Sequence, residues 1–281
     1  MYKTATSLIT NLGLSLVLTV GLTGWLIKTV HAQDVAATLE TAIQAPHRSD
    51  ANRARDQYRH PKETLLFFGL QPNMSVVEIS PANGWYTEII APVLKKQGQF
   101  YAAVPALADD VPEAMKRRDA SYRQMLKAAP DLYGYPVIST YDVSAPVFAP
   151  NSKADLVLTF RNVHNWAKAG HTQPMFNGFF QVLKSGGVLG VVEHRAKPGT
   201  PLSQQIESGY MTEQFVIESA TAAGFRLDRS SEINSNPLDT KDHPGGVWNL
   251  LPNLRGLADN DKPKYRALGE SDRMTLRFIK P

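Results

Sequence analysis

The sequence predicts a doubly wound α/β fold built around one mainly parallel β-sheet. Apolar, β-branched stretches alternate with helical stretches along most of the chain, as they do where crossover helices join parallel strands. The stretch from Ser75 to Ile90 reads as strand, tight turn and helix: Ser-Val-Val-Glu-Ile, Ser-Pro-Ala-Asn-Gly and Trp-Tyr-Thr-Glu-Ile-Ile. A final strand follows a long irregular segment. Ligands of such folds bind at the carboxyl ends of the strands, beside the loops and helix starts that follow them.

Seven strands are expected in chain order. The fourth is apolar on both faces, which is typical of a strand buried between two layers of helices. The last is expected to lie antiparallel beside the sixth, in a sheet whose other six strands are parallel. The expected strands cover residues 76–79, 99–104, 136–142, 154–160, 188–192, 225–229 and 274–279.

Helices are expected between these strands. The first begins at Pro61 and ends at Gly69, which are the residues favoured at the first turn and just after the last. Lys184-Ser-Gly-Gly187 reads as a turn into the fifth strand. Residues 231–272 form an irregular insertion rich in Pro, Gly, Asp and Asn, and such long segments are usually functional or flexible. The other expected helices cover residues 85–98, 112–129, 173–183 and 210–223.

The N-terminus has the pattern of a secretory signal peptide. Lys3 precedes an apolar run at 12–27, and Val30-His31-Ala32 suits cleavage before Gln33. The alternative is an uncleaved anchor, although the run is short for a membrane span and is interrupted by small and hydroxyl residues. We therefore expect a signal peptide at 1–32, an N-terminal extension at 33–60 and one domain at 61–281, in a periplasmic or secreted protein without a stable membrane span.

The charge balance excludes a nucleic-acid-binding surface. The chain has 30 Lys and Arg residues against 26 Asp and Glu, and Lys3 and Lys28 leave with the signal peptide. Nucleic-acid binding requires a clustered basic face, and the short run Lys116-Arg117-Arg118 lies among acidic residues. The absence of cysteine excludes disulfides, thiolate metal sites and cysteine nucleophiles, and it suits an oxidising compartment. A small molecule is the expected partner, and the oligomeric state is not indicated.

Five features in a fixed order resemble the seven-stranded, Rossmann-like fold of class I S-adenosylmethionine-dependent methyltransferases over residues 60–281. They are the acid and loop at 78–84, Asp142 after the third strand, the exit of the fourth strand at 155–166, Lys184-Ser-Gly-Gly187 and the terminal strand. Four longer motifs resemble a family of bacterial predicted methyltransferases whose members often carry signal peptides: Glu-Ile-Ser-Pro-Ala-Asn-Gly-Trp-Tyr-Thr-Glu, Phe-Arg-Asn-Val-His-Asn-Trp, Val-Glu-His-Arg and Glu-Ile-Asn-Ser-Asn-Pro-Leu-Asp-Thr-Lys-Asp-His-Pro.

The resemblance implies S-adenosylmethionine as cofactor and a set of residues around it. Asp142 falls where the fold often contacts the adenine amino group, and Arg161 and Asn162 fall where the backbone passes the methionine portion. The positions around the ribose and methionine are Glu78, Ser80, Ala82 and Gly84.

Two departures from the family pattern stand out. Of its three alternate glycines only Gly84 is present, and a Cβ on a loop that a ligand approaches closely is obstructive. The second departure is Val104-Pro105, which occupies the place of an acid that usually binds the ribose hydroxyls, although Asp109 and Asp110 follow shortly after.

The candidate catalytic residues lie at the ends of the fourth and fifth strands. Methyl transfer needs alignment of the acceptor and sometimes a base. His164 and Asn165 are placed for that task, and Glu193 lies at the same edge. A structural hydrogen-bonding role is an equal alternative for His164. One of Glu193 and His194 is also expected to be structural. The expected reaction is methyl transfer to an unknown acceptor. The alternative is an exported, non-catalytic methyltransferase-fold domain that binds a small polar or nucleoside-like ligand. A hydrolase is disfavoured because the chain lacks a Gly-x-Ser-x-Gly motif.

Three further groups of residues have ordinary alternatives. No pair among the histidines has tight metal-ligand spacing, so no metal site is expected from His164, His171, His194 and His243 with Glu193 and Asp242. Trp85 and Tyr86 form either a substrate wall or a contact with the N-terminal extension. The segment 55–60, with Arg55, Tyr58, Arg59 and His60, is read as solvated rather than as a lid, and turn chemistry accounts for the polar residues of the insertion unless it covers the cleft.

Overall fold

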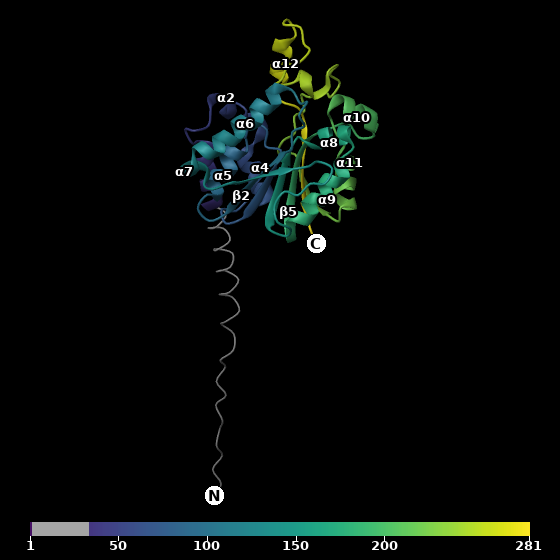
Figure 1. The fold of residues 1–281 in the computed structure, drawn as a ribbon. Coiled ribbons are helices and arrows are strands. Elements are labelled where there is room, and N and C mark those ends of the chain that lie inside the picture. Colours follow the sequence, from purple (N-terminus) through teal and green to yellow (C-terminus); the bar gives the residue numbers. More distant parts are fainter. Residues whose placement is uncertain (2–33) are drawn as a thin grey trace.

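The computed structural model describes Met1 and residues 34–281, which form a seven-stranded sheet with helices on both faces (Figure 1). The strand order is β3-β2-β1-β4-β5-β7-β6, with β7 antiparallel to both neighbours and the other pairs parallel. The predicted fold class is therefore confirmed. The predicted signal peptide lies, apart from Met1, outside the described residues. The strands are β1 (Ser75–Ile79), β2 (Gln99–Pro105), β3 (Val137–Tyr141), β4 (Ala154–Phe160), β5 (Leu183–His194), β6 (Arg226–Ser231) and β7 (Arg273–Ile279).

The helices form two layers, one on each face of the sheet (Figure 1). One layer contains α4 (Pro61–Phe68), α5 (Thr87–Leu94), α6 (Glu113–Ala128) and α7 (Pro130–Tyr133). The other contains α8 (Val163–Ala169), α9 (Thr172–Val182), α10 (Leu202–Ser208) and α11 (Glu213–Ala222). The remaining helical elements are α2 (Asp50–Arg53), α3 (Asp56–Arg59), η1 (Gly246–Asn249) and α12 (Lys262–Leu268).

Strand alternation separates two hydrophobic cores. In β1, Val76 belongs to the core beneath α4 and α5, whereas Val77 and Ile79 belong to the core beneath α9. Successive side chains of a strand point to opposite faces. Glu78, next to Val77 in β1, therefore points toward the α5 layer.

The structure corrects three local predictions. The segment 184–187 belongs to β5 rather than to a turn, and the register of β4 and β5 shifts between Ala154 and Leu156. The helices α8, α10 and α12 were not predicted. The N-terminal extension, read as polar with a possible helix at 35–43, is indeed helical at residues 34–43, but it packs on the domain, because Val35 and Leu39 are buried in the first core.

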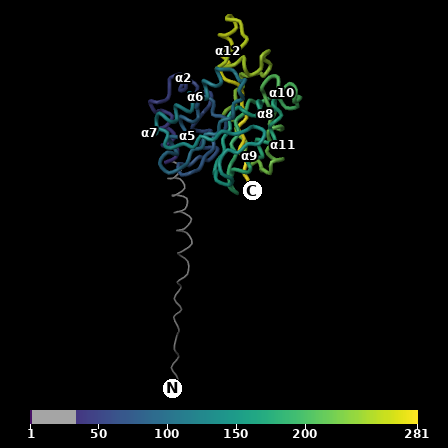
Figure 2. Tube along the Cα trace, in the orientation of Figure 1, coloured from purple at the N-terminus to yellow at the C-terminus, as the bar shows by residue number. Residues whose placement is uncertain are grey.

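The insertion between β6 and β7 rises from the carboxyl end of the sheet and carries α12 at its tip (Figure 2). Two asparagines fix its base: the buried Asn234 donates to the hydroxyls of Thr64 (3.0 Å) and Thr275 (2.9 Å). Asn236 donates to the carbonyls of Leu268 and Glu270. Its polar content thus does more than form turns. Within residues 34–281, none of the helices combines the length and the apolar character that crossing a bilayer requires.

Candidate functional site

The loop after β1 has the backbone of a loop with three alternate glycines. Ser80, Ala82 and Gly84 all have positive φ, at 49°, 56° and 81°. Glycine adopts this left-handed region freely, whereas an L-residue there costs about 1–2 kcal/mol. The loop has therefore kept the conformation although two of its three positions carry a Cβ atom.

Glu78 supports this loop from below rather than facing a ligand. Its carboxyl group accepts a hydrogen bond from Thr87 Oγ1 at 2.6 Å, and Tyr122 Oη lies 3.0 Å from the same Thr87 oxygen. Burial raises the pKa of Glu78 to about 8. Strand alternation directs this side chain under α5, where it contacts Thr87, and the contact with a ribose that the resemblance implies stays a prediction.

Gly84 contacts α6. A Cβ atom at this position would lie 2.8 Å from Met125 Cε and 3.0 Å from Tyr122 Cε2. These distances are shorter than van der Waals contact, and φ is positive as well. The glycine is therefore required by the helix that covers the loop, so a valine there would disturb packing before it obstructed a ligand.

The carboxyl ends of β1, β3 and β4 are joined by side-chain hydrogen bonds. Asn162 Nδ2 donates to the carbonyl of Ile79 at 3.1 Å, and the hydroxyls of Ser80 and Tyr141 lie 2.6 Å apart. The Ser80 side chain is thus turned toward β3. The structure brings Ser80 and Asn162 to one edge, as expected from the positions of their strands.

The acids after β2 and β3 lie at the periphery of this edge. Asp142 is exposed and accepts hydrogen bonds from the backbone N–H and hydroxyl of Ser144, both at 2.8 Å. These bonds lower the pKa of Asp142, so the group is ionised and accessible. Asp109 and Asp110, in the loop after β2, are exposed as well.

His164 and Glu193 form a buried pair. Glu193, at the end of β5, accepts from the backbone N–H of Val163 at 2.6 Å through Oε2, and its Oε1 lies 3.0 Å from His164 Nδ1. The carboxylate therefore orients the imidazole through Nδ1, which leaves Nε2 as the nitrogen available to a ligand. This is the arrangement of an oriented general base.

Asn165 does not join this pair. It is exposed on α8, whereas His164 is buried on the same helix. Neighbouring residues of an α-helix point in directions about 100° apart. The prediction that His164 and Asn165 act together at the end of β4 is therefore not supported by their orientation.

The structure places a third polar side chain, His194, beside the pair. One potential ligand atom from each of His164, Glu193 and His194 lies within 4.8 Å of the others, close enough to hold a metal ion. These groups already have protein partners, because His194 Nδ1 is bonded to the Ser271 hydroxyl and the Glu193 carboxylate has four hydrogen-bond partners. Burial and neighbouring cations lower the pKa of His194 well below its usual value. This positive surrounding opposes binding of a cation.

The positive surrounding comes from an arginine cluster around Glu270, which sequence analysis missed. The arginine cluster consists of Arg55, Arg59, Arg161 and Arg273, whose guanidinium nitrogens lie 2.7, 3.0, 3.7 and 3.1 Å from a Glu270 carboxylate oxygen. Although burial alone would raise it, the four cations lower the pKa of Glu270 to about 2.

Arg161 and the 55–60 segment differ from their predicted roles. Arg161 has a positive φ of 61° at the end of β4, and its side chain extends toward Glu270 rather than leaving only its backbone at the site. Arg59 is only 1% exposed, so the reading of segment 55–60 as solvated is wrong. The spacing of Arg55 and Arg59 by one helical turn was the signal that both point the same way.

Trp85 is buried against the N-terminal extension. Its Nε1–H donates to the carbonyl of Asn52 at 3.0 Å, and the guanidinium carbons of Arg48 and Arg59 lie 5.1 and 4.6 Å from its ring centroid. Tyr86 is also buried and stacks on Phe160. Of the two alternatives for this aromatic pair, contact with the extension is correct.

A cavity of about 880 Å³ lies between α10 and the insertion. Its aromatic wall includes Tyr210, Trp248 and Tyr265. The Trp248 ring lies 6.2 Å from the His164 ring, and the Tyr210 ring lies 6.3 Å from the His194 ring. The insertion therefore forms a cavity whose wall reaches the histidines, and none of the residues predicted as site residues lines it.

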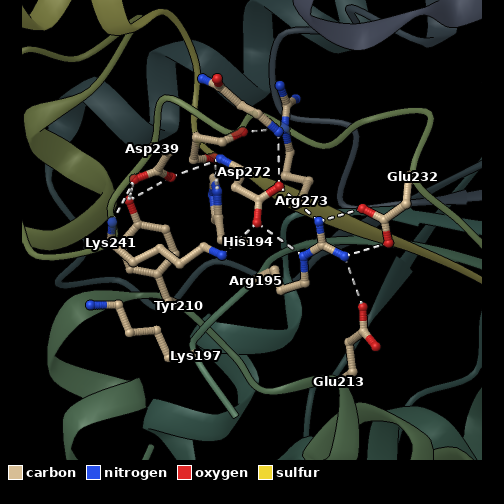
Figure 3. Close-up of polar contacts among 12 residues, drawn as sticks. His194, Arg195, Lys197, Tyr210, Glu213, Glu232, Asp239, Lys241, Asp272 and Arg273 are labelled. Carbon is tan, nitrogen blue, oxygen red and sulfur yellow. Dashed lines mark hydrogen bonds and ion pairs between the residues drawn. The ribbon is translucent and has the colours of Figure 1, made fainter.

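Buried acids hold the cavity wall in place (Figure 3). Tyr210 donates its hydroxyl to Asp239 at 2.9 Å, and Lys241 pairs with Asp272 at 2.8 Å. Arg195, directly after β5, binds both oxygens of Asp272 at 2.9 Å. These contacts fasten the insertion to the carboxyl end of the sheet.

Comparison with known proteins supports the architecture. No family model and no curated protein matches the sequence. Among solved structures, a S-adenosylmethionine-dependent methyltransferase from Aquifex aeolicus is 14% identical, with a TM-score of 0.54 over 81% of this chain and 93% of that one. The chain has the class I methyltransferase fold.

Two further solved structures show that proteins with different reactions share this fold. A geranyl diphosphate methyltransferase in complex with S-adenosylmethionine has a TM-score of 0.54 at 10% identity, over 86% of this chain and 95% of that one. A protein described as a [4+2]-cyclase has the same TM-score at 14% identity, over 88% of this chain and 93% of that one. The shared fold therefore does not by itself decide the reaction.

Proposed function

We propose that the protein transfers a methyl group from S-adenosylmethionine to a small-molecule acceptor. The observation that carries this proposal is the backbone of the 80–84 loop. Two non-glycine residues hold a left-handed conformation there at an energetic cost, and strained backbone concentrates at functional sites. Ser80 and Ala82 hold this conformation at two positions that the resemblance assigns to the cofactor.

The residues around the loop fit this cofactor in part. The amides of Ser80 and Gly84 already donate to the carbonyls of Ala103 and Pro81, which leaves the rest of the loop backbone and the exposed carboxylate of Asp142 to offer hydrogen bonds to a nucleoside. Asn162 holds the loop to β4. Ser80 turns its hydroxyl to Tyr141, so its polar group does not point across the loop. When bound, the cofactor supplies an electrophilic methyl group, and the protein's own contribution is to orient the acceptor.

His164 is the proposed base. Glu193 holds its Nδ1, and its Nε2 can accept a proton from an acceptor hydroxyl, amine or acid. The 880 Å³ cavity, whose Trp248 wall adjoins the His164 ring, is the proposed place for the acceptor body. Asn165, exposed on α8, is not needed for this step.

Export remains part of the proposal. Lys3, the apolar run and Val30-His31-Ala32 support cleavage before Gln33 and a periplasmic or secreted location. Likeness of four motifs to exported bacterial predicted methyltransferases supports the same view. The cofactor is then required outside the cytoplasm. Cofactor binding without methyl transfer would favour the alternative, a non-catalytic binding domain.

The test is methyl transfer from radiolabelled S-adenosylmethionine to a periplasmic extract of the native host. We expect His164→Ala to lower the rate about a hundredfold while cofactor affinity stays nearly unchanged, because a base acts in the transition state. The matched control is His47→Ala, which removes a histidine bonded to the Glu88 carbonyl and should retain the rate. Cofactor binding without any transfer by the unmodified protein would contradict the proposed reaction.

A further inference from the structure

The arginine cluster has more positive charge than its acid can neutralise. In the described part of the chain, Glu270 is the one carboxylate within ion-pair distance of any of Arg55, Arg59, Arg161 and Arg273. Four guanidinium groups therefore share one negative charge. Burial lowers the pKa of Arg161 to about 10, as expected where a cation is short of partners.

Arg59 shows the missing partner most directly. Its Nε donates to Glu270 at 3.0 Å, but Nη1 and Nη2 are buried without a hydrogen-bond partner among residues 34–281. The ring of Trp85 lies 4.6 Å from the Arg59 guanidinium carbon and supplies a cation–π contact, which does not replace directed acceptors. Buried donors of a charged group are costly when left unpaired.

The cluster is not sealed from solvent. The side chains of Arg55 and Arg161 are both 24% exposed, whereas that of Glu270 is 3% exposed. The partly exposed Arg55 and Arg161 thus form the outer rim, and the buried Arg59 forms the floor. Arg161 directly follows β4 and precedes His164 by three residues, so the rim lies beside the proposed reaction site.

We propose that the arginine cluster binds an anionic group, a carboxylate or a phosphate, of a ligand at the carboxyl edge of the sheet. The planar guanidinium group matches the two oxygens of either anion. The assignment of that anion to the methyl acceptor rests on the proposed function. A sulfonium cofactor is itself cationic beside this cluster, so an acidic acceptor offsets the repulsion and the two ligands assist each other's binding.

The first experiment uses inorganic phosphate as the probe. We expect phosphate to raise the thermal unfolding midpoint of the protein saturably, beyond sodium chloride of the same ionic strength, because it binds the folded state. Arg161→Gln and Arg55→Gln should each abolish most of this rise, and Arg161→Lys should retain part of it. The matched control Arg118→Gln, exposed on α6, should keep the full rise. Equal midpoints in phosphate and chloride, or an unchanged rise in Arg161→Gln, would overturn the proposal.

The second experiment identifies the source of the anion. S-adenosylhomocysteine carries a carboxylate, whereas methylthioadenosine has the nucleoside without one. If the acceptor supplies the anion, phosphate should leave the affinity for S-adenosylhomocysteine unchanged or increase it. If phosphate at ten times its own dissociation constant weakens that affinity about tenfold but spares methylthioadenosine, the cofactor's carboxylate fills the cluster and the acceptor assignment fails. Phosphate binding without any nucleoside binding would retain the cluster and reject the proposed function.

Discussion

The two halves of the sheet's carboxyl edge differ in what they offer a ligand: backbone geometry in one half and side-chain chemistry in the other. At β1, β2 and β3, backbone geometry is retained: the loop has three positive φ angles, while its acid Glu78 is buried with a pKa of about 8. At β4, β5 and the insertion, side-chain chemistry dominates, with an oriented His164, the arginine cluster and the cavity. In the first half, hydrogen bonds join the strand ends and the exposed acids lie around them, whereas the second half carries the clustered cations and the cavity.

Ligand specificity is expected to come from the charged half of this edge. A loop that presents backbone amides works with several residue types as long as its conformation is kept, so Ser80 and Ala82 are compatible with ligand binding. The charged half selects among ligands, because an unpaired guanidinium group gains binding free energy mainly from an anionic ligand. We therefore expect the acceptor, rather than the cofactor, to be distinguished by the residues specific to this chain.

The largest expected effect concerns the charged half. Glu270→Ala leaves four guanidinium groups without their shared anion, and breaking a buried ion pair in this way typically costs about 3–5 kcal/mol of unfolding free energy. Urea unfolding measures it. The control Asp259→Ala removes a 92% exposed partner of Lys262 and should change stability by less than about 1 kcal/mol. Equal losses of unfolding free energy in the two variants would show that Glu270 stabilises the protein no more than an exposed ion pair does.

The next prediction concerns the neutral acid of the other half. Because the pKa of Glu78 rises from 4.5 to about 8 on folding, its protonated form is favoured in the folded state. Its contribution to stability is full below about pH 4.5 and is lost as the pH rises to about 8. We expect Glu78→Gln to flatten this part of the profile of urea midpoint against pH. Glu63→Gln, exposed on α4, should leave the profile as it is. If the urea midpoint of Glu78→Gln falls with pH as steeply as that of the unmodified protein, Glu78 does not contribute to the pH dependence, and a raised pKa for Glu78 is contradicted.

The smallest expected effect tests the strain in the loop. Ala82→Gly relieves a positive φ at an exposed position, and we expect a gain of up to about 1 kcal/mol in unfolding free energy. The same change at Ala120, exposed in α6, should instead lose about 1 kcal/mol. Thermal unfolding of the two variants measures these changes in unfolding free energy, which we expect to have opposite signs. A loss at both positions would mean that the loop stores no strain.

The sequence predicted the features that depend on local pattern. The approximate strand positions and the antiparallel β7 beside β6 follow from alternation and the terminal strand, and the loop at 80–84 was located by its turn residues. It did not predict the direction of Glu78, because one residue of strand parity decides which layer a side chain enters. It also missed the arginine cluster, whose residues come from positions 55–59, 161 and 270–273 and meet only in the folded chain.

Calorimetric titration with S-adenosylmethionine and S-adenosylhomocysteine tests whether the 80–84 loop belongs to a site for this cofactor. We expect saturable binding of both at one site per chain, weakened by Asn162→Ala, which frees the loop from β4, and retained in Asn165→Ala, which changes an exposed residue of the next helix. Absence of binding by either nucleoside to the folded protein would contradict the account, because the strained loop would then hold its conformation for another ligand.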